Sequence, residues 1–208
     1  DDNAEHLTNW DTSTFFKLPD NIILGRHTLR VSLRNDEHEP IGVEDRVEFV
    51  VVDSATSSHA KSESLVDVSK WQQQDSALDS LASHRPANVN CPENTWYEED
   101  GALEVETGYC NYFSVSQPAQ VAVSKGDNLH LVLWHGQLNF DEPADAHVAV
   151  SIGGDLVWED FIEIPNLGGV YDITVPSTIS SLPGDTVEFH LHNHGYNSWT
   201  LLTLEVER

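Results

Sequence analysis

Short stretches of alternating hydrophobic and polar residues run through the last two thirds of the chain. In residues 186–192, Val187, Phe189 and Leu191 take every second position, which places them on one face of a β-strand. Similar segments, separated by turns rich in Gly and Pro, predict about eight strands and therefore a β-sandwich over residues 88–208. The predicted strands are 112–115, 119–123, 128–135, 146–152, 156–164, 170–175, 186–192 and 199–206.

Residues 1–53 repeat this alternation on a smaller scale. Thr28–Leu33 and Arg46–Val52 read as half-buried strands, and a third strand is predicted near Thr12–Leu18. A small β-sandwich of this kind normally has about seven strands in two sheets. Three strands form a single sheet, so one of its apolar faces is left uncovered. Either that face packs on the second domain, or strands from another polypeptide complete the sheet. The second alternative predicts a neighbouring subunit as a partner.

The middle of the chain, residues 54–87, is rich in Ser and Ala, a composition typical of a linker. Within it, Val68–Leu81 is predicted to form a short helix with Pro86 after its end. Trp71 is too apolar to remain exposed in a tether, so we expect it to dock on one of the domains.

Two segments resemble known families. The run LPDNIILGRHTLRVSLRNDEHEPIGVEDRVEFVVVD, Leu18 to Asp53, resembles the closing strands of an immunoglobulin-like domain of secreted bacterial proteins, with its Gly turn, H-T-L-R-V strand and final V-x-F-x-V strand. The later strands resemble carbohydrate-binding jelly rolls in order and length, and secreted bacterial modules that end in a run similar to H-L-H-N-H-G-x-N-S-W. The resemblances imply an all-β chain: a short, possibly incomplete three-stranded immunoglobulin-like sheet followed by a C-terminal jelly-roll β-sandwich.

Charge narrows the range of partners. The chain carries 35 acidic and 10 basic side chains, a net charge of -25, whereas binding to nucleic acid needs clustered Lys and Arg. No run of 18 apolar residues predicts a membrane span, and the first residues lack the basic start and apolar run of a signal peptide. The charge therefore argues against nucleic acid as a partner. The resemblances to secreted bacterial proteins imply a secreted, cell-surface or periplasmic protein.

The two cysteines, Cys91 and Cys110, flank an acidic loop with Gly101 in its middle. In a β-rich acidic chain they are expected to form a disulfide, which would stabilise the domain by about 3 kcal/mol. Two unpaired buried thiols are the alternative. A zinc site is disfavoured because neither cysteine has a C-x-x-C neighbour.

Three histidines alternate near the end of the chain, at His190, His192 and His194. Strand parity turns His190 and His192 outward, about 7 Å apart, a separation from which two imidazoles can converge on one zinc or copper ion. His194 is expected to be carried away by the turn that follows.

A third metal ligand would have to come from another strand. His147 points outward from its strand and joins the pair if the two strands share a sheet, whereas His135 has core parity and needs a bend at Gly136. The predicted metal site therefore draws on five histidines: His190, His192, His147, His135 and His194. Contact with a glycan or another ligand without metal, and simple hydrogen bonding, are the alternatives.

Aromatic side chains offer a different function. Sugar rings stack on flat aromatic faces, and Trp134 and Tyr196 are the candidates for exposure. Trp134 shares the outward face of its strand with His130, and Tyr196 sits in the histidine turn. Trp134, Tyr196 and His130 are therefore the predicted ligand-binding residues of a glycan-binding module.

Other chemistry is less well supported by the sequence. Acidic clusters such as Glu98-Glu99-Asp100 suit calcium in loops, but no EF-hand run is present. The run E-F-H-L-H-N-H-G looks like the zinc strand of α-type carbonic anhydrases, yet no histidine follows His194, so that family's pattern fails. Nucleophile elbows, H-E-x-x-H runs and phosphate-binding Gly loops do not occur. An enzyme is accordingly the minority interpretation.

These patterns predict a secreted, non-catalytic binding module with a histidine-based zinc or copper site on the outer face of the C-terminal sandwich, around His147, His190, His192 and Trp134. Two alternatives stay open. One is a structural subunit of an extracellular assembly, joined by strand complementation through the N-terminal sheet. The other is a glycan-binding module.

Overall fold

The structure is a computed structural model that describes residues 22–35, 39–51, 61–75 and 77–208. The chain divides into two compact units, residues 1–59 and residues 60–208. The described secondary structure is almost entirely β-strand, as the alternation of the sequence predicts. Within the described ranges, no helix has the length and apolar character needed to cross a membrane.

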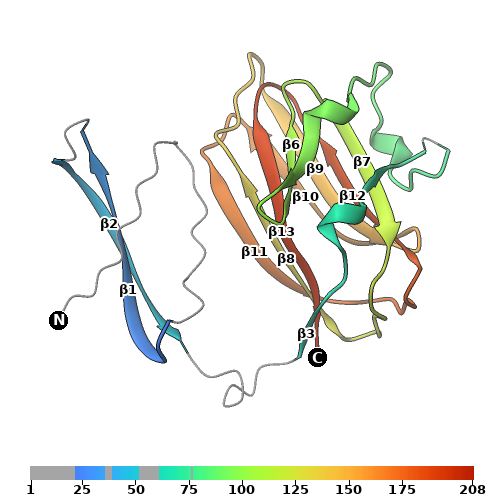
Figure 1. Ribbon diagram of the computed structural model, residues 1–208. Coiled ribbons are helices and arrows are strands. Elements are labelled where there is room, and N and C mark those ends of the chain that lie inside the picture. Colours follow the sequence, from blue (N-terminus) through green and yellow to red (C-terminus); the bar gives the residue numbers. More distant parts are fainter. Residues whose placement is uncertain (1–21, 36–38, 52–60, 76) are drawn as a thin grey trace. The chain divides into compact units, whose positions relative to one another are not determined.

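The first unit contains a β-hairpin. Strands β1 (Gly25–Arg34) and β2 (Pro40–Val51) pair antiparallel, with Leu29 opposite Val47 (Figure 1). The strand predicted near Thr12–Leu18 lies outside the described residues. Apolar side chains of the hairpin such as Val31 are more than half exposed. Completion of this sheet by a neighbouring chain stays a prediction.

The second unit is a β-sandwich of two antiparallel sheets (Figure 1). The sheet named here the β12 sheet has the order β10 (Asp155–Ile164), β9 (Ala144–Ile152), β12 (Thr186–His192), β7 (Tyr112–Pro118) and β4 (Gln72–Gln73). The β13 sheet has the order β11 (Gly169–Pro176), β8 (Asn128–His135), β13 (Ser198–Glu207), β6 (Ala102–Glu106) and β5 (Trp96–Glu99), and β3 (Ser62–Ser64) also pairs with β13. The predicted jelly-roll sandwich is confirmed, and β8 and β12 have the predicted bounds.

The core lies between the two sheets and is built from the alternate apolar positions of each strand. Burying each of these side chains contributes about 1.5–3 kcal/mol. Trp71 is also buried, with its ring 6.5 Å from that of Phe189, so its predicted docking is confirmed. The largest fully buried side chains are Trp199, Phe113, Phe189, Leu65, Leu103, Leu129, Leu133, Leu138, Ile152, Ile164 and Leu191.

The segment between the cysteines is a hairpin rather than a loop. Asp100 and Gly101 form its tight turn, both with positive φ (49° and 82°), a conformation that favours the pairing of β5 with β6. The predicted disulfide between Cys91 and Cys110 is confirmed. Over residues 119–123, where a strand is predicted, only an isolated bridge joins Val123 to Ser181.

The described part of the predicted linker belongs to the sandwich, because the second unit begins at Ala60. In place of one helix over Val68–Leu81, this region contains the 3-10 helices η1 (Val68–Lys70) and η2 (Ala82–His84), with β4 between them. Pairing of β4 with β7 holds the chain extended and so interrupts a continuous helix. A further 3-10 helix, η3 (Glu93–Thr95), precedes β5.

Candidate functional site

The outer face of the β12 sheet is covered by the chain itself. Residues 74, 75 and 77–85, called here the covering segment, contact β7, β12 and β9. The Gln74 amide donates to the Ser114 carbonyl oxygen at 2.9 Å, and Leu81 is buried against the sheet. The Ser- and Ala-rich composition of this segment predicts a linker, so the cover is a feature that sequence reasoning missed.

Glu188 of β12 anchors the covering segment. Its carboxylate is 2% exposed and accepts hydrogen bonds from the hydroxyl groups of Ser80 (2.6 Å), Ser114 (2.9 Å) and Ser151 (3.3 Å), and from the Ser80 amide (3.3 Å). A buried carboxylate is costly unless donors surround it. Here the donors come from both the sheet and the cover, so the charge holds the two together.

A second polar group fastens the same segment. The Tyr112 hydroxyl donates to the buried Asp79 carboxylate, and the Arg85 guanidinium lies 3.4 Å from that carboxylate and 5.2 Å from the centre of the Tyr112 ring. Burial and the neighbouring Asp79 raise the pKa of Tyr112. The phenol therefore stays protonated and keeps its role as a donor.

The histidine strands are neighbours, which decides the main question posed by the sequence. Strand β12 pairs with β9, and His192 lies opposite His147. The ring centres of His147 and His190 are 5.0 Å apart. The sequence expectation that His190 faces outward is met in direction only, because the covering segment leaves this side chain 0% exposed.

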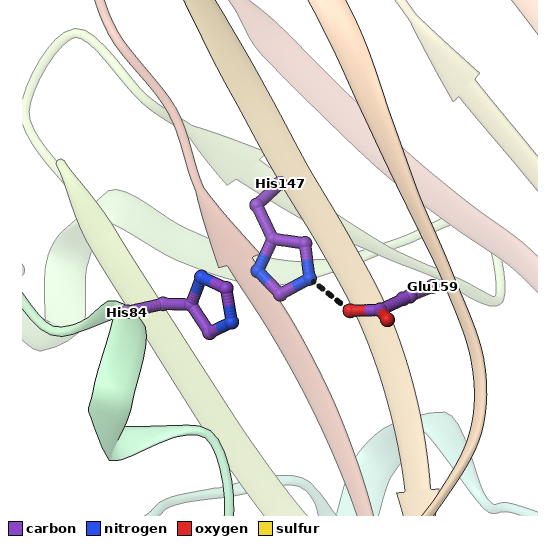
Figure 2. A group of neighbouring side chains, drawn as sticks. All are labelled: His84, His147 and Glu159. Carbon is purple, nitrogen blue, oxygen red and sulfur yellow. Dashed lines mark hydrogen bonds and ion pairs between the residues drawn. The ribbon is translucent and has the colours of Figure 1, made fainter.

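Two further residues join His147 that were not among the sequence candidates (Figure 2). His84, from η2, stacks on the His147 ring with 4.0 Å between ring centres, and Glu159 of β10 lies 3.0 Å from the His147 Nε2 atom. One ligand atom from each of the three residues lies within 4.8 Å of the others. Within the described part of the chain, no other trio of metal-ligating side chains has this spacing, carboxylate clusters included.

Burial favours the neutral forms of His147 and His190. It lowers the pKa of His147, with Glu159 opposing the shift, and it lowers the pKa of His190 to about 2, aided by His147 and His192. Both ring nitrogens of His190 and the Nδ1 atom of His147 are buried without a hydrogen-bond partner. Neutral imidazoles with unused nitrogens are the form in which histidine binds metals.

The other four predicted ligands, His190, His192, His135 and His194, lie outside the trio. His135 is predicted to join the site through a bend at Gly136, and this is corrected: β8 belongs to the β13 sheet, and the buried ring packs 4.6 Å from Trp199, with Nδ1 2.7 Å from the Gly136 carbonyl oxygen. His194 follows β12, with its ring 5.0 Å from that of His192 and 5.6 Å from Phe140.

The outer face of the β13 sheet has a different character. The strand register places Tyr97 of β5, Glu104 of β6, Thr200 of β13 and Trp134 of β8 in one row across the sheet. Tyr97 is 40% exposed, Glu104 and Trp134 are half-buried, and Thr200 between these two is 2% exposed. The indole of Trp134 extends toward Gly136, two residues further along the chain. Its Cη2 atom is 3.9 Å from the position that a Cβ on Gly136 would take. The row, called here the aromatic row, combines two aromatic rings with a carboxyl group.

Glu104 carries the electrostatic character of this row. Partial burial together with the neighbouring carboxylates Glu99 and Glu106 raises its pKa to about 7, while a hydrogen bond with Tyr97 opposes the shift. Glu104 therefore exchanges its proton near neutral pH. The same three carboxylates, with burial, raise the pKa of Tyr97.

The remaining ligand-binding candidates separate from each other. His130 lies on the same face as Trp134 and pairs with Asp172 at 2.9 Å and with Glu207 at 3.7 Å. Tyr196 lies in the turn after β12, 78% exposed and edge-on to Tyr109. The sequence expectation that Trp134 shares a face with the β12 histidines is corrected, since the two belong to different sheets.

Comparisons with known proteins give structural similarity alone. Neither the protein-family models nor the curated protein sequences yield a match. Among solved structures, the carbohydrate-binding module CBM4 is 17% identical, with 57% of this chain and 91% of that chain covered and a TM-score of 0.37. The module CBM29-2 in complex with mannohexaose is 13% identical, with 71% and 91% covered and a TM-score of 0.38. The CBM22-1 xylan-binding domain from Paenibacillus barcinonensis is 12% identical, with 72% and 93% covered and a TM-score of 0.30. At these values no ligand or residue role transfers to this chain.

Proposed function

We propose that this protein is a glycan-binding β-sandwich module that binds a neutral oligosaccharide along the aromatic row of the β13 sheet. The observation that carries the proposal is the register that aligns Tyr97, Glu104 and Trp134 on one outer face. Aromatic faces stack on the apolar faces of sugar rings, and a carboxyl group beside them accepts hydrogen bonds from sugar hydroxyls.

The spacing of the row sets the size of the ligand. Tyr97 and Trp134 are separated by three strand-to-strand steps, from β5 to β8, or roughly 14 Å at the usual strand spacing. A single sugar ring cannot contact both aromatic residues at that separation. The expected ligand is therefore a chain of several sugar units that runs across the strands.

The charge of the face sets the type of glycan. Glu99 and Glu106 lie beside Glu104 of the row, and Asp172 lies on the same face. Uronic acids and sulfated sugars would be repelled, since like charges at close range disfavour binding. The ligand is expected to be neutral. A polysaccharide ligand and the Cys91–Cys110 disulfide both suit an extracellular location.

The proposal is tested by calorimetric titration of the full chain with cellohexaose, xylohexaose and mannohexaose, with an oligogalacturonide as the anionic comparison. At least one neutral hexasaccharide should bind, and Trp134→Ala and Tyr97→Ala should each weaken binding at least tenfold, about 1.4 kcal/mol. Tyr196→Ala is the matched control, because it removes an equally large aromatic group away from the row.

Two results would contradict the proposal. One is saturable binding that survives Trp134→Ala, and the other is binding that Tyr196→Ala abolishes. Preference for the oligogalacturonide over every neutral hexasaccharide would overturn the assignment of the ligand class.

A further inference from the structure

The covered face of the sandwich holds a group of side chains that glycan binding does not use. His84, His147 and Glu159 come from three different elements, η2, β9 and β10, yet their ligand atoms lie within 4.8 Å of one another. Figure 2 shows the three side chains converging, with His147 between the other two. Two imidazole nitrogens and one carboxylate oxygen are a ligand set that zinc and copper accept.

A second observation points to a missing ligand at the same place. His190 is fully buried beside the trio, 5.0 Å from His147 and 6.2 Å from His84 between ring centres. Neither of the ring nitrogens of His190 has a hydrogen-bond partner. Buried polar atoms are nearly always hydrogen-bonded, so two unpaired nitrogens on a fully buried ring require a cause.

From these observations we infer that His84, His147 and Glu159 bind one divalent transition-metal ion, Zn²⁺ or Cu²⁺, with His190 positioned as a further nitrogen donor. The His147 Nε2 atom lies 3.0 Å from the Glu159 carboxylate, and an ion bound at Nε2 would replace the proton of that hydrogen bond. His84 stacks on His147, so its ring must turn to direct a nitrogen at the ion.

The ion would connect the covering segment to the sheet. His84 belongs to the covering segment, whereas His147 and Glu159 belong to the sheet beneath it. Metal binding would therefore add to the anchoring that Glu188 and Tyr112 provide. Because this site and the aromatic row lie on opposite faces of the sandwich, failure of either proposal leaves the other standing.

The test is titration of the metal-free full chain with Zn²⁺, Cu²⁺ and Ca²⁺, with the bound metal measured per chain. We expect one equivalent of Zn²⁺ or Cu²⁺ to bind per chain, and His84→Ala and Glu159→Gln should each lower the affinity for that ion at least tenfold. Ca²⁺ should not bind at this site, because calcium prefers oxygen ligands. Glu159→Gln lies outside the covering segment and so separates loss of a ligand from loss of the cover. The matched control is His130→Ala, which removes a histidine paired with two carboxylates on the other face.

Hydrogen exchange supplies a readout that is independent of the titration. Some amides in residues 77–85 can exchange only when the local structure opens and the metal site is lost. With zinc at about 100 times its dissociation constant, these amides should exchange about 100-fold more slowly than in the metal-free chain. The proposal is overturned if zinc and copper both leave exchange there unchanged, if His84→Ala and Glu159→Gln bind as the unaltered protein does, or if His130→Ala loses the same equivalent.

Discussion

The two outer faces of the sandwich carry similar residue types and handle them in opposite ways. On the β12 sheet, Glu188 and Tyr112 are buried beneath the covering segment and satisfied by protein partners. On the β13 sheet, Glu104 and Tyr97 keep part of their surface in water and lie beside other carboxylates. A glutamate and a tyrosine on a strand thus have all their polar groups bonded within the protein where the chain covers them, and keep part of their surface in water where it does not.

The largest expected effect comes from exchanging the two glutamates for glutamine. Glu188→Gln replaces one acceptor oxygen with a donating amide, so at least one buried donor around it loses its partner and stability falls by about 2 kcal/mol. Glu104→Gln removes a carboxyl group from an acidic cluster and should cost nothing at pH 7.5. Denaturant unfolding of both variants measures the difference.

Equal losses of unfolding free energy in the two glutamine variants would contradict the proposed difference between the two faces. A gain in stability for Glu188→Gln would show that the buried charge costs more than its hydrogen bonds return.

The tyrosines should differ in the same direction by a smaller amount. Tyr112→Phe removes the hydroxyl that donates to Asp79, a hydrogen bond to a charged group worth about 1.5 kcal/mol. It should also speed hydrogen exchange in residues 77–85. Tyr97→Phe, at a partly exposed position, should stay within about 0.5 kcal/mol of the unaltered protein. Unchanged exchange in Tyr112→Phe would show that Asp79 and Arg85 hold the cover without it.

The smallest expected effect is a pH dependence of the stability that comes from Glu104 on the outer face of the β13 sheet. The pKa of Glu104 is about 7 in the folded protein and near 4.5 in the unfolded chain, so the folded state binds the extra proton between these values. Its contribution to stability is fully present below pH 4.5 and is lost as pH rises to 7. After discounting for solvent screening, the loss is about 1 kcal/mol.

Unfolding free energies measured from pH 4.5 to 8 check this sign. Glu104→Gln should lose less stability over that range than the unaltered protein does. Identical pH profiles would show that Glu104 does not carry the shifted pKa.

The sequence predicts on which face of a strand a side chain lies better than it predicts which strands are neighbours in a sheet. Alternation along β8 and β12 gives the bounds of both strands, and alternation along β9 and β12 correctly turns His147 and His190 outward. Parity does not tell which sheet a strand joins, so the sequence pattern places Trp134 and His135 with histidines that belong to the other sheet. Those pairings link residues far apart in the chain and leave no local signal.

The parts of both sites that the sequence missed have local causes. The hairpin that carries Tyr97 and Glu104 is rich in acidic residues, which are depleted in strands, so it resembles a loop. His84 lies in a segment whose Ser and Ala content is typical of a linker, although Ser80 in that segment satisfies a buried carboxylate. The Asp100-Gly101 pair is the one available signal, since Asp-Gly marks a tight hairpin turn.

The most direct test of the central claim is a nuclear magnetic resonance titration of the isotope-labelled full chain with the neutral hexasaccharide that binds best. We expect the ligand to perturb the signals of the Trp134 indole and of the amides of β5, β6, β13 and β8. The chemical shifts of residues 77–85, β9 and β12 should not change. Perturbations centred on the covering segment and β12, with an unmoved Trp134 indole, would contradict the central claim.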